Sequence, residues 1–309
     1  MSNKDTILIF REPELYFFPH YKDIIFQPLR ISEKSFSYLV YKLLYILHIP
    51  QCAFFWGDWK EHLKTAKQVI IFDYGYQRGM ENYIRKINPD CKVYLFMWNK
   101  IDSVHKNHTL FSDKSSIYST DPQDCKKYHL KYNHMFYPME YLNEDYFFDK
   151  QRLFFIGKDK NRGTKIQTLY HLLKESGIEC DIRLLTSNKK TEYLTKIADI
   201  LTNKPLSYND YLKELNNCNI LLDIVQSGQL ALTMRVVESL FLSKKLITNN
   251  TDIKNYDFYN PNNIFILPDV WDSNLILQLK EFVNKPYHPY DKELLSKYDF
   301  NHWLSTFDA

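Results

Sequence analysis

The stretch NILLDIVQSGQLALTMRVVESLFLSKKLITNN, residues 219–250, carries the clearest structural signal in this chain. It begins with an apolar run typical of a buried strand and breaks into the polar segment QSGQ at 226–229. Apolar residues then recur with helical spacing over 232–243, and a second apolar run, KLITN, follows. A strand, a polar loop, a helix and another strand form a parallel βαβ unit, so this stretch predicts an α/β fold.

The same alternation of short apolar runs and helix-length amphipathic segments extends along the whole chain. The second half adds the strand candidates RLFFIG, CDIRLLT and IFIL, and the first half has candidates at 6–10, 68–74, 92–98 and 116–120. The polar stretch 141–151 separates the two halves. We therefore expect two Rossmann-like domains facing a central cleft, at 1–145 and 146–309, with the last helix packing back on the N-terminal domain.

The overall charge argues against one class of partner. Its 40 basic and 37 acidic side chains leave a net charge of +3, which gives no electrostatic case for binding a nucleic acid. The N-terminus lacks the pattern of an export signal. The longest apolar stretch, 36–49, is shorter than the roughly 20 residues of a membrane span, so we expect a cytoplasmic protein. That stretch is interpreted either as a core helix or as an aromatic surface facing an acceptor or a membrane.

Ligands of open α/β sheets bind at the carboxyl ends of the strands, so we expect the loops that follow the strands to carry the functional residues. The strand candidate FFIG continues into GKDKNRGTK, where Gly157 would permit a sharp turn. Lys158, Lys160 and Arg162 surround the start of the next predicted helix. A helix N-terminus with nearby cations favours a phosphate group, and the alternative is an ordinary solvated, charged turn.

The helix expected over 232–243 carries polar residues that a core helix does not need. At about 100° per residue, its apolar side chains fall on one arc and its polar side chains on the other. Glu238 could accept hydrogen bonds from vicinal hydroxyls, or it could form a surface ion pair with Arg235. The apolar arc comprises Val236, Val237, Leu240 and Phe241, and the polar arc comprises Arg235, Glu238 and Ser239.

The block 219–250, with FFIGKDKNRGTKIQTLYHLLKESGIECDIRLL before it and YDFYNPNNIFIL after it, resembles the nucleotide-sugar half of GT-B glycosyltransferases of bacterial capsule and lipopolysaccharide synthesis. The resemblance covers about 152–267, and the first half agrees in general layout. The family forms its donor pocket from a strand, a glycine-containing loop, a helix with a glutamate and a following "pvIT" motif. This chain has Ser243, Lys244 and Lys245 where many members have glycine before that motif, and it lacks the EX7E pair of retaining enzymes.

The resemblance implies a metal-independent, inverting glycosyltransferase that needs no cofactor. It would move a sugar from a nucleotide-sugar donor to an oligosaccharide or lipid-linked glycan acceptor, with peripheral contact to a membrane. By the same resemblance Glu238 would hold the ribose, the amides around the polar loop would meet the diphosphate, and Lys158 or Arg162 would neutralise the leaving group. The implied donor site comprises Gly157, Lys158, Arg162, Gln226, Gly228, Gln229, Thr233, Arg235 and Glu238.

An inverting transfer also needs a base for the acceptor hydroxyl. Asp73 follows a strongly apolar strand, and its alternative role is to cap the next turn. Glu12, Glu14 and His20 follow the first strand and are further candidates. A two-domain regulatory protein that binds a nucleotide or sugar without turnover is the alternative function, because a sensor pocket uses similar contacts.

Overall fold

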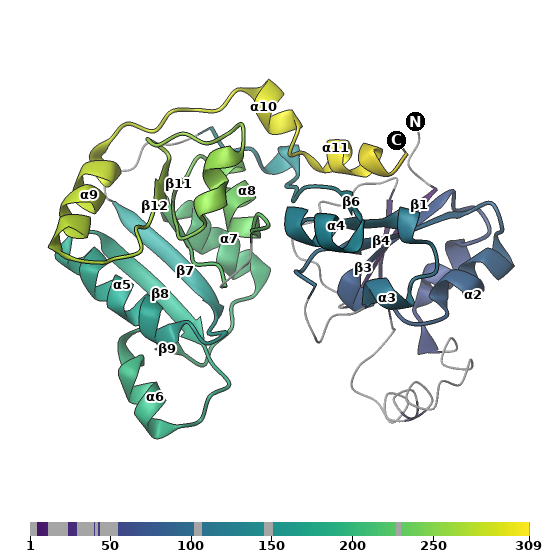
Figure 1. The fold of residues 1–309 in the computed structure, drawn as a ribbon, viewed down its shortest axis with the longest axis horizontal. Coiled ribbons are helices and arrows are strands. Elements are labelled where there is room, and N and C mark those ends of the chain that lie inside the picture. Colours follow the sequence, from purple (N-terminus) through teal and green to yellow (C-terminus); the bar gives the residue numbers. More distant parts are fainter. Residues whose placement is uncertain are drawn as a thin grey trace. The chain divides into compact units, whose positions relative to one another are not determined.

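The computed structural model describes residues 5–11, 24–29, 40, 43, 55–101, 107–144, 151–226 and 230–308. The chain divides into two compact units, unit 1 with Met1–His134 and Thr306–Ala309, and unit 2 with Met135–Ser305. In its described part each unit contains one six-stranded sheet whose strand pairs are all parallel (Figure 1). This confirms the predicted α/β class. The domain boundary proposed from the sequence, between 145 and 146, falls outside the described residues.

The sheet of unit 1 has the strand order β2-β1-β3-β4-β5-β6. All residues of β1 and β3 are buried, as expected of parallel strands covered on both faces, and this is why the sequence shows continuous apolar runs there. The sequence analysis missed β2, an edge strand that ends in a proline, and β6, which has only two residues. The elements are β1 (Thr6–Phe10), β2 (Ile24–Pro28), β3 (Gln68–Phe72), β4 (Lys92–Met97), β5 (Ile117–Ser119), β6 (Lys131–Tyr132), α2 (Met80–Ile87), α3 (Asn107–Leu110) and α4 (Pro122–Tyr128).

The sheet of unit 2 has the strand order β12-β11-β10-β7-β8-β9. Counted from its own first strand, this is the order 3-2-1-4-5-6 of Rossmann folds, with the topological switch point between β7 and β10. Its strands are β7 (Arg152–Lys158), β8 (Glu179–Leu185), β9 (Leu201–Thr202), β10 (Ile220–Asp223), β11 (Lys245–Thr248) and β12 (Ile264–Ile266). Its helices are α5 (Gly163–Glu175), α6 (Thr191–Lys196), α7 (Tyr208–Asn216), α8 (Met234–Phe241), α9 (Ser273–Asn284), α10 (Lys292–Ser296) and α11 (Phe300–Ser305).

Successive residues of β7 pack on opposite faces of this sheet. Phe155 belongs to a core that includes Ile166 of α5 and Leu279 of α9. Phe154 packs instead against Tyr211 of α7, with ring centroids 5.9 Å apart. Figure 1 shows α5 and α9 on one face of the sheet and α7 and α8 on the other. The carboxyl ends of β7 and β10 are therefore flanked by helices from both layers.

Helix α8 differs from its predicted form. It is shorter than the predicted 232–243, and every residue from Val236 to Phe241 is buried, including Glu238 and Ser239. The expected polar face is therefore wrong for these two residues: Tyr211 of α7 covers Glu238, and the Ser239 hydroxyl donates to the Val236 carbonyl of its own helix. The helix ends where Ser243 adopts a left-handed conformation, with φ of 51°, and the Lys244 amide donates to the Ser239 carbonyl.

The apolar stretch 36–49, interpreted from the sequence as a core helix or an aromatic surface, lies almost wholly outside the described residues. Within the described ranges, no helix has both the length and the apolar character needed to cross a bilayer.

Candidate functional site

Gly157 lies inside β7 rather than in a turn, which corrects the role expected from the sequence. The turn that follows is formed by Lys160 and Asn161, both in the left-handed region with φ of 47° and 63°. A Cβ atom on Gly157 would lie 3.0 Å from Phe155 Cζ, 3.3 Å from Arg235 Nη2 and 3.5 Å from Arg162 Nη2. The glycine thus makes room for two guanidinium groups at the end of β7.

These two arginines share one aromatic ring. The Cζ atoms of Arg235 and Arg162 lie 4.7 Å and 5.7 Å from the centroid of Phe155. Arg235 donates to the Ile156 carbonyl, and Arg162 donates from Nη2 to the Lys158 carbonyl at 3.2 Å. Burial and the charge of Arg235 lower the pKa of Arg162 to about 10, and its buried Nε finds no acceptor among the described residues. Two like charges in this position favour a bound anion.

The N-terminus of α5, where the sequence suggested a phosphate, already holds a carboxylate. The amides of Arg162 and Gly163 donate to Asp159 Oδ1 at 3.1 Å and 2.8 Å. The hydroxyls of Thr186 and Tyr193 donate to Asp159 Oδ2 at 2.9 Å and 2.7 Å. The first amide of α5 is therefore already bonded to a carboxylate, whose negative charge would repel an anion at this helix N-terminus.

Lys158 and Lys160, both exposed, add to the positive charge where β7 leads into α5. Partial desolvation lowers the pKa of Lys160, and the charges of Arg162, Lys158 and Arg235 lower it further. These four cations therefore lie within one another's electrostatic field.

The end of β10 contributes an acid and an open helix terminus. Asp223 is 1% exposed, and its carboxylate accepts from Thr233 Oγ1 at 2.9 Å and Thr248 Oγ1 at 3.1 Å. Burial raises the pKa of Asp223, while Arg235 and Arg162 oppose that rise. Thr233 is the N-cap residue of α8, yet its hydroxyl turns to Asp223 and no described side chain caps the helix. The Val236 amide donates to the Thr233 carbonyl, whereas the amides of Met234 and Arg235 have no partner among the described residues and could bind a ligand.

Glu238 lies deeper on α8, where only 3% of it is exposed. The Tyr211 hydroxyl donates to Glu238 Oε2 at 2.6 Å, and Arg235 makes its contacts with Ile156 and Phe155 instead. The interpretation of Arg235 and Glu238 as a surface ion pair is therefore wrong. Burial raises the pKa of Glu238 to about 7, against the opposing effects of Tyr211 and Arg235.

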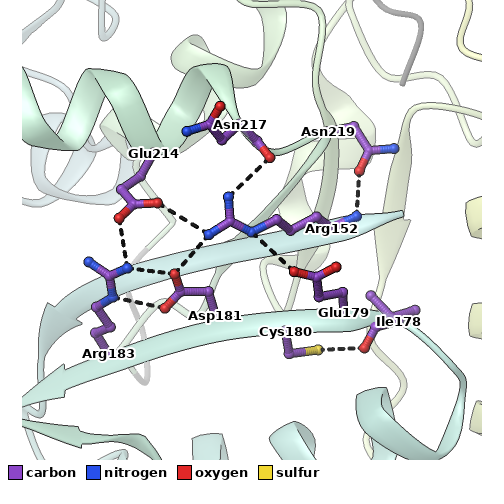
Figure 2. Close-up of polar contacts among 9 residues, drawn as sticks. All are labelled: Arg152, Ile178, Glu179, Cys180, Asp181, Arg183, Glu214, Asn217 and Asn219. Carbon is purple, nitrogen blue, oxygen red and sulfur yellow. Dashed lines mark hydrogen bonds and ion pairs between the residues drawn. The ribbon is translucent and has the colours of Figure 1, made fainter. Parts of the chain in front are cut away.

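Helix α7, which carries Tyr211, is fixed to the sheet by a closed ring of charges (Figure 2). Arg152 Nη2 lies 3.1 Å from Asp181 Oδ2 and 3.2 Å from Glu214 Oε2. Arg183 Nη2 lies 2.6 Å from Asp181 Oδ2 and 2.7 Å from Glu214 Oε1. Because each carboxylate lies between two guanidinium groups, the ring ties β7, β8 and α7 together. It thereby supports the position of Tyr211 beside Glu238.

Asp73, the described base candidate, follows β3 in unit 1 and is 2% exposed. Its Oδ1 accepts from the Tyr74 amide at 2.7 Å, and its Oδ2 accepts from the amide and side chain of Asn99 at 2.8 Å and 3.0 Å. These are the contacts of a loop-capping residue, and the role of base stays a prediction. Glu12, Glu14 and His20 lie outside the described residues.

The structure gathers part of the predicted donor set at the β7–β10 switch point. Gly157, Arg162 and Arg235 meet there, Thr233 joins them through Asp223, and Lys158 is exposed on the adjoining loop. Gln226 is exposed, whereas Gly228 and Gln229 lie outside the described residues. The sequence did not predict four further residues that contact this set, namely Phe155, Asp159, Tyr211 and Asp223. The position of Asp159 and Asp223 at strand ends was the available signal.

No protein-family model and no curated protein sequence matches the chain. Among solved structures, HepE from Anabaena in complex with UDP-glucose gives a TM-score of 0.56 at 7% identity, covering 98% of both chains. The same protein with UDP and glucose gives 0.55 at 6% identity with equal coverage. AviGT4, a glycosyltransferase involved in avilamycin A biosynthesis, gives 0.50 at 8% identity, covering 81% of this chain and 77% of its own. At such identities the likeness shows the fold, which these proteins share with this chain.

Proposed function

We propose that this protein is a glycosyltransferase that uses a nucleotide-sugar donor bound by unit 2. The observation that carries the proposal is the pair of guanidinium groups that meet at Gly157, at the switch point of a Rossmann sheet. Arginine suits a diphosphate because its donors form a rigid fork that matches phosphate oxygens. Fold likeness to AviGT4 and to HepE, which was crystallised with UDP-glucose, supports the same assignment.

The charge balance of the site suits a diphosphate. Lys158, Lys160, Arg162 and Arg235 are positive, and the buried carboxylates near them are those of Asp159, Asp223 and Glu238. The cations outnumber the carboxylates even when all three are ionised, so the excess positive charge would attract the dianionic diphosphate of a nucleotide sugar. Fixed cations and the open N-terminus of α8 would stabilise charge on the departing diphosphate without a metal ion.

In the proposed reaction an acceptor hydroxyl attacks the anomeric carbon of the sugar. The bond from that carbon to the diphosphate oxygen breaks, and the electron pair leaves with the nucleoside diphosphate. The hydroxyl proton passes to a base, for which Asp73, Glu14 and His20 stay the candidates. A single displacement of this kind inverts the configuration at the anomeric carbon. We propose a growing surface glycan of the capsule or lipopolysaccharide type as the acceptor.

Glu238 is proposed to accept hydrogen bonds from the ribose. Its second oxygen, Oε1, has no hydrogen-bond partner among the described residues, since Tyr211 bonds Oε2. The ribose hydroxyls would donate to the ionised carboxylate, so that binding and ionisation are linked.

A thermal-shift panel of UDP, GDP, ADP, CMP and dTDP sugars tests the donor assignment. A ligand at 100 times its Kd should stabilise the protein by about 2.7 kcal/mol. Arg162→Met should weaken binding of the best ligand by at least tenfold, because it removes a charged partner of the diphosphate. Lys174→Met, at the exposed last turn of α5, removes the same charge away from the site and is the matched control. Equal affinities in the two variants would contradict the assignment.

Turnover separates the enzyme from the regulatory alternative. The best ligand of the panel should be hydrolysed slowly alone and consumed faster when glycan acceptors are added. A protein that binds it tightly and releases no nucleoside diphosphate with any acceptor would be a binding protein instead.

A further inference from the structure

We propose that Asn249 and Asn250, which follow β11, are positioning residues for the donor site. They hold the two described ends of the connection between β10 and α8. This inference rests on the proposed function, because it assigns the asparagines a role in nucleotide affinity. Neither side chain carries a charge that could bind the diphosphate itself.

Asn249 acts on the first end of the connection. Its Oδ1 accepts from the Val225 amide at 2.7 Å, and its Nδ2 donates to the Val225 carbonyl at 3.2 Å. One side chain therefore satisfies both backbone groups of a residue that has left the strand ladder. This reciprocal pair fixes the direction in which the chain leaves β10, just before the exposed Gln226.

Asn250 acts on the other end and is itself buried. Its Nδ2 donates to the Leu230 carbonyl at 3.3 Å, and its Oδ1 accepts from the Asp252 amide at 3.1 Å. Its own amide donates to Thr248 Oγ1, which in turn donates to Asp223. Three consecutive residues at and after the end of β11 thus bond the chain between β10 and α8. Thr248 bonds Asp223 at the end of β10, Asn249 bonds Val225, and Asn250 bonds Leu230.

These contacts matter for binding because they fix the start of α8. The helix has no side-chain cap among the described residues, so its amides are held in place by the chain that leads into them. If Val225 and Leu230 lost their bonds to the asparagines, the ligand would have to order these two ends of the connection when it binds. The conformational entropy lost in that ordering would weaken the affinity for the ligand. The asparagines therefore preorganise the site without touching the nucleotide.

The test compares Asn249→Ala and Asn250→Ala with Asn255→Ala, whose exposed side chain makes a 3.4 Å contact with Asp252 Oδ1. The Kd of the best nucleoside diphosphate is measured by calorimetry at a temperature where urea titration shows each variant to be folded. We expect about a tenfold rise in Kd for each of the first two variants and an unchanged Kd for Asn255→Ala.

A structural role alone would lower the urea midpoint of Asn249→Ala and Asn250→Ala and leave their Kd unchanged, and this result would overturn the proposal. Asn249 is partly exposed, so its variant provides the test if Asn250→Ala does not fold. If the wild-type protein binds no nucleoside diphosphate at all, the proposed function has failed before the asparagines are tested. The two failures are therefore distinguishable.

Discussion

The buried carboxyl of Glu238 makes the stability of this protein depend on pH in a predictable way. The folded protein holds this group with a pKa of about 7, compared with its ordinary value of 4.5. Between these values the unfolded chain loses the proton and the folded protein keeps it. Folding therefore becomes less favourable as the pH rises through this window, and the loss is complete above the folded pKa. At 1.36 kcal/mol per pKa unit the contribution amounts to about 3 kcal/mol.

Glu238→Gln should remove this dependence. Glutamine keeps an oxygen that can accept from the Tyr211 hydroxyl, and it is as good a helix former as glutamate. Urea unfolding at pH 5, 6, 7 and 8 should show the variant gaining stability relative to wild type, by about 2.5 kcal/mol across the series, because part of the loss in wild type has already occurred at pH 5. Glu175→Gln, on the exposed side of α5, controls for the loss of a carboxylate. Parallel pH profiles for wild type and Glu238→Gln would refute the reasoning.

The same variant tests the ribose role with the opposite sign. A ligand that donates to the ionised carboxylate must lower the pKa of Glu238. Wild type should therefore bind the nucleoside diphosphate at least tenfold more tightly than Glu238→Gln at pH 8, and the ratio should shrink toward pH 6. Inorganic pyrophosphate, which lacks the ribose, should bind both proteins alike. A ratio of one for the nucleotide at every pH would reject the ribose contact.

Three further substitutions and one control have outcomes that follow from the structure. Ser243→Gly should raise the free energy of unfolding by about 1 kcal/mol, because glycine adopts the left-handed conformation found there without strain; a loss of stability in urea would contradict this. Glu214→Ala should lower the free energy of unfolding by about 2 kcal/mol, because it opens the charge ring. Its control is Glu179→Ala, which removes a mostly exposed carboxylate 3.7 Å from Arg152 and should change the free energy of unfolding by under about 0.5 kcal/mol in the same assay. Asp73→Asn should lower the thermal midpoint, since its amide would face N–H donors, and a base role further requires transfer to fall by about 10² to 10⁴ with donor Kd unchanged.

Much of the fold could be predicted because buried parallel strands leave a strong pattern. The runs at β1, β3 and β10 are apolar on both faces, and structure places strands at each. The short edge strands β6 and β9 contain two residues each, too few to show any period. Local pattern thus identifies the central strands and the apolar edge strand β12, and it misses the edge strands β2, β6 and β9.

The candidate site was predictable in composition and not in arrangement. Basic residues after β7 and the polar residues of α8 were visible from the sequence. The sequence pattern does not reveal that Asp159 occupies the N-terminus of α5, because that position depends on Thr186, which follows β8, and on Tyr193 of α6. Periodicity likewise placed Glu238 on a polar arc, whereas tertiary packing by α7 buried it.

The unequal treatment of the two helix N-termini in unit 2 explains why an anion would bind at the β7–β10 switch point. Asp159 supplies an internal carboxylate that accepts from the amides of the N-cap residue Arg162 and of Gly163, the first residue of α5. Helix α8 receives no such group from a described side chain, because Thr233 turns its hydroxyl to Asp223. Beside it, Gly157 admits the guanidinium groups of Arg162 and Arg235, and burial together with the repulsion from Arg235 lowers the pKa of Arg162. A dianionic ligand would remove that repulsion and fill the open terminus at once, so binding there should stabilise the folded protein through both effects.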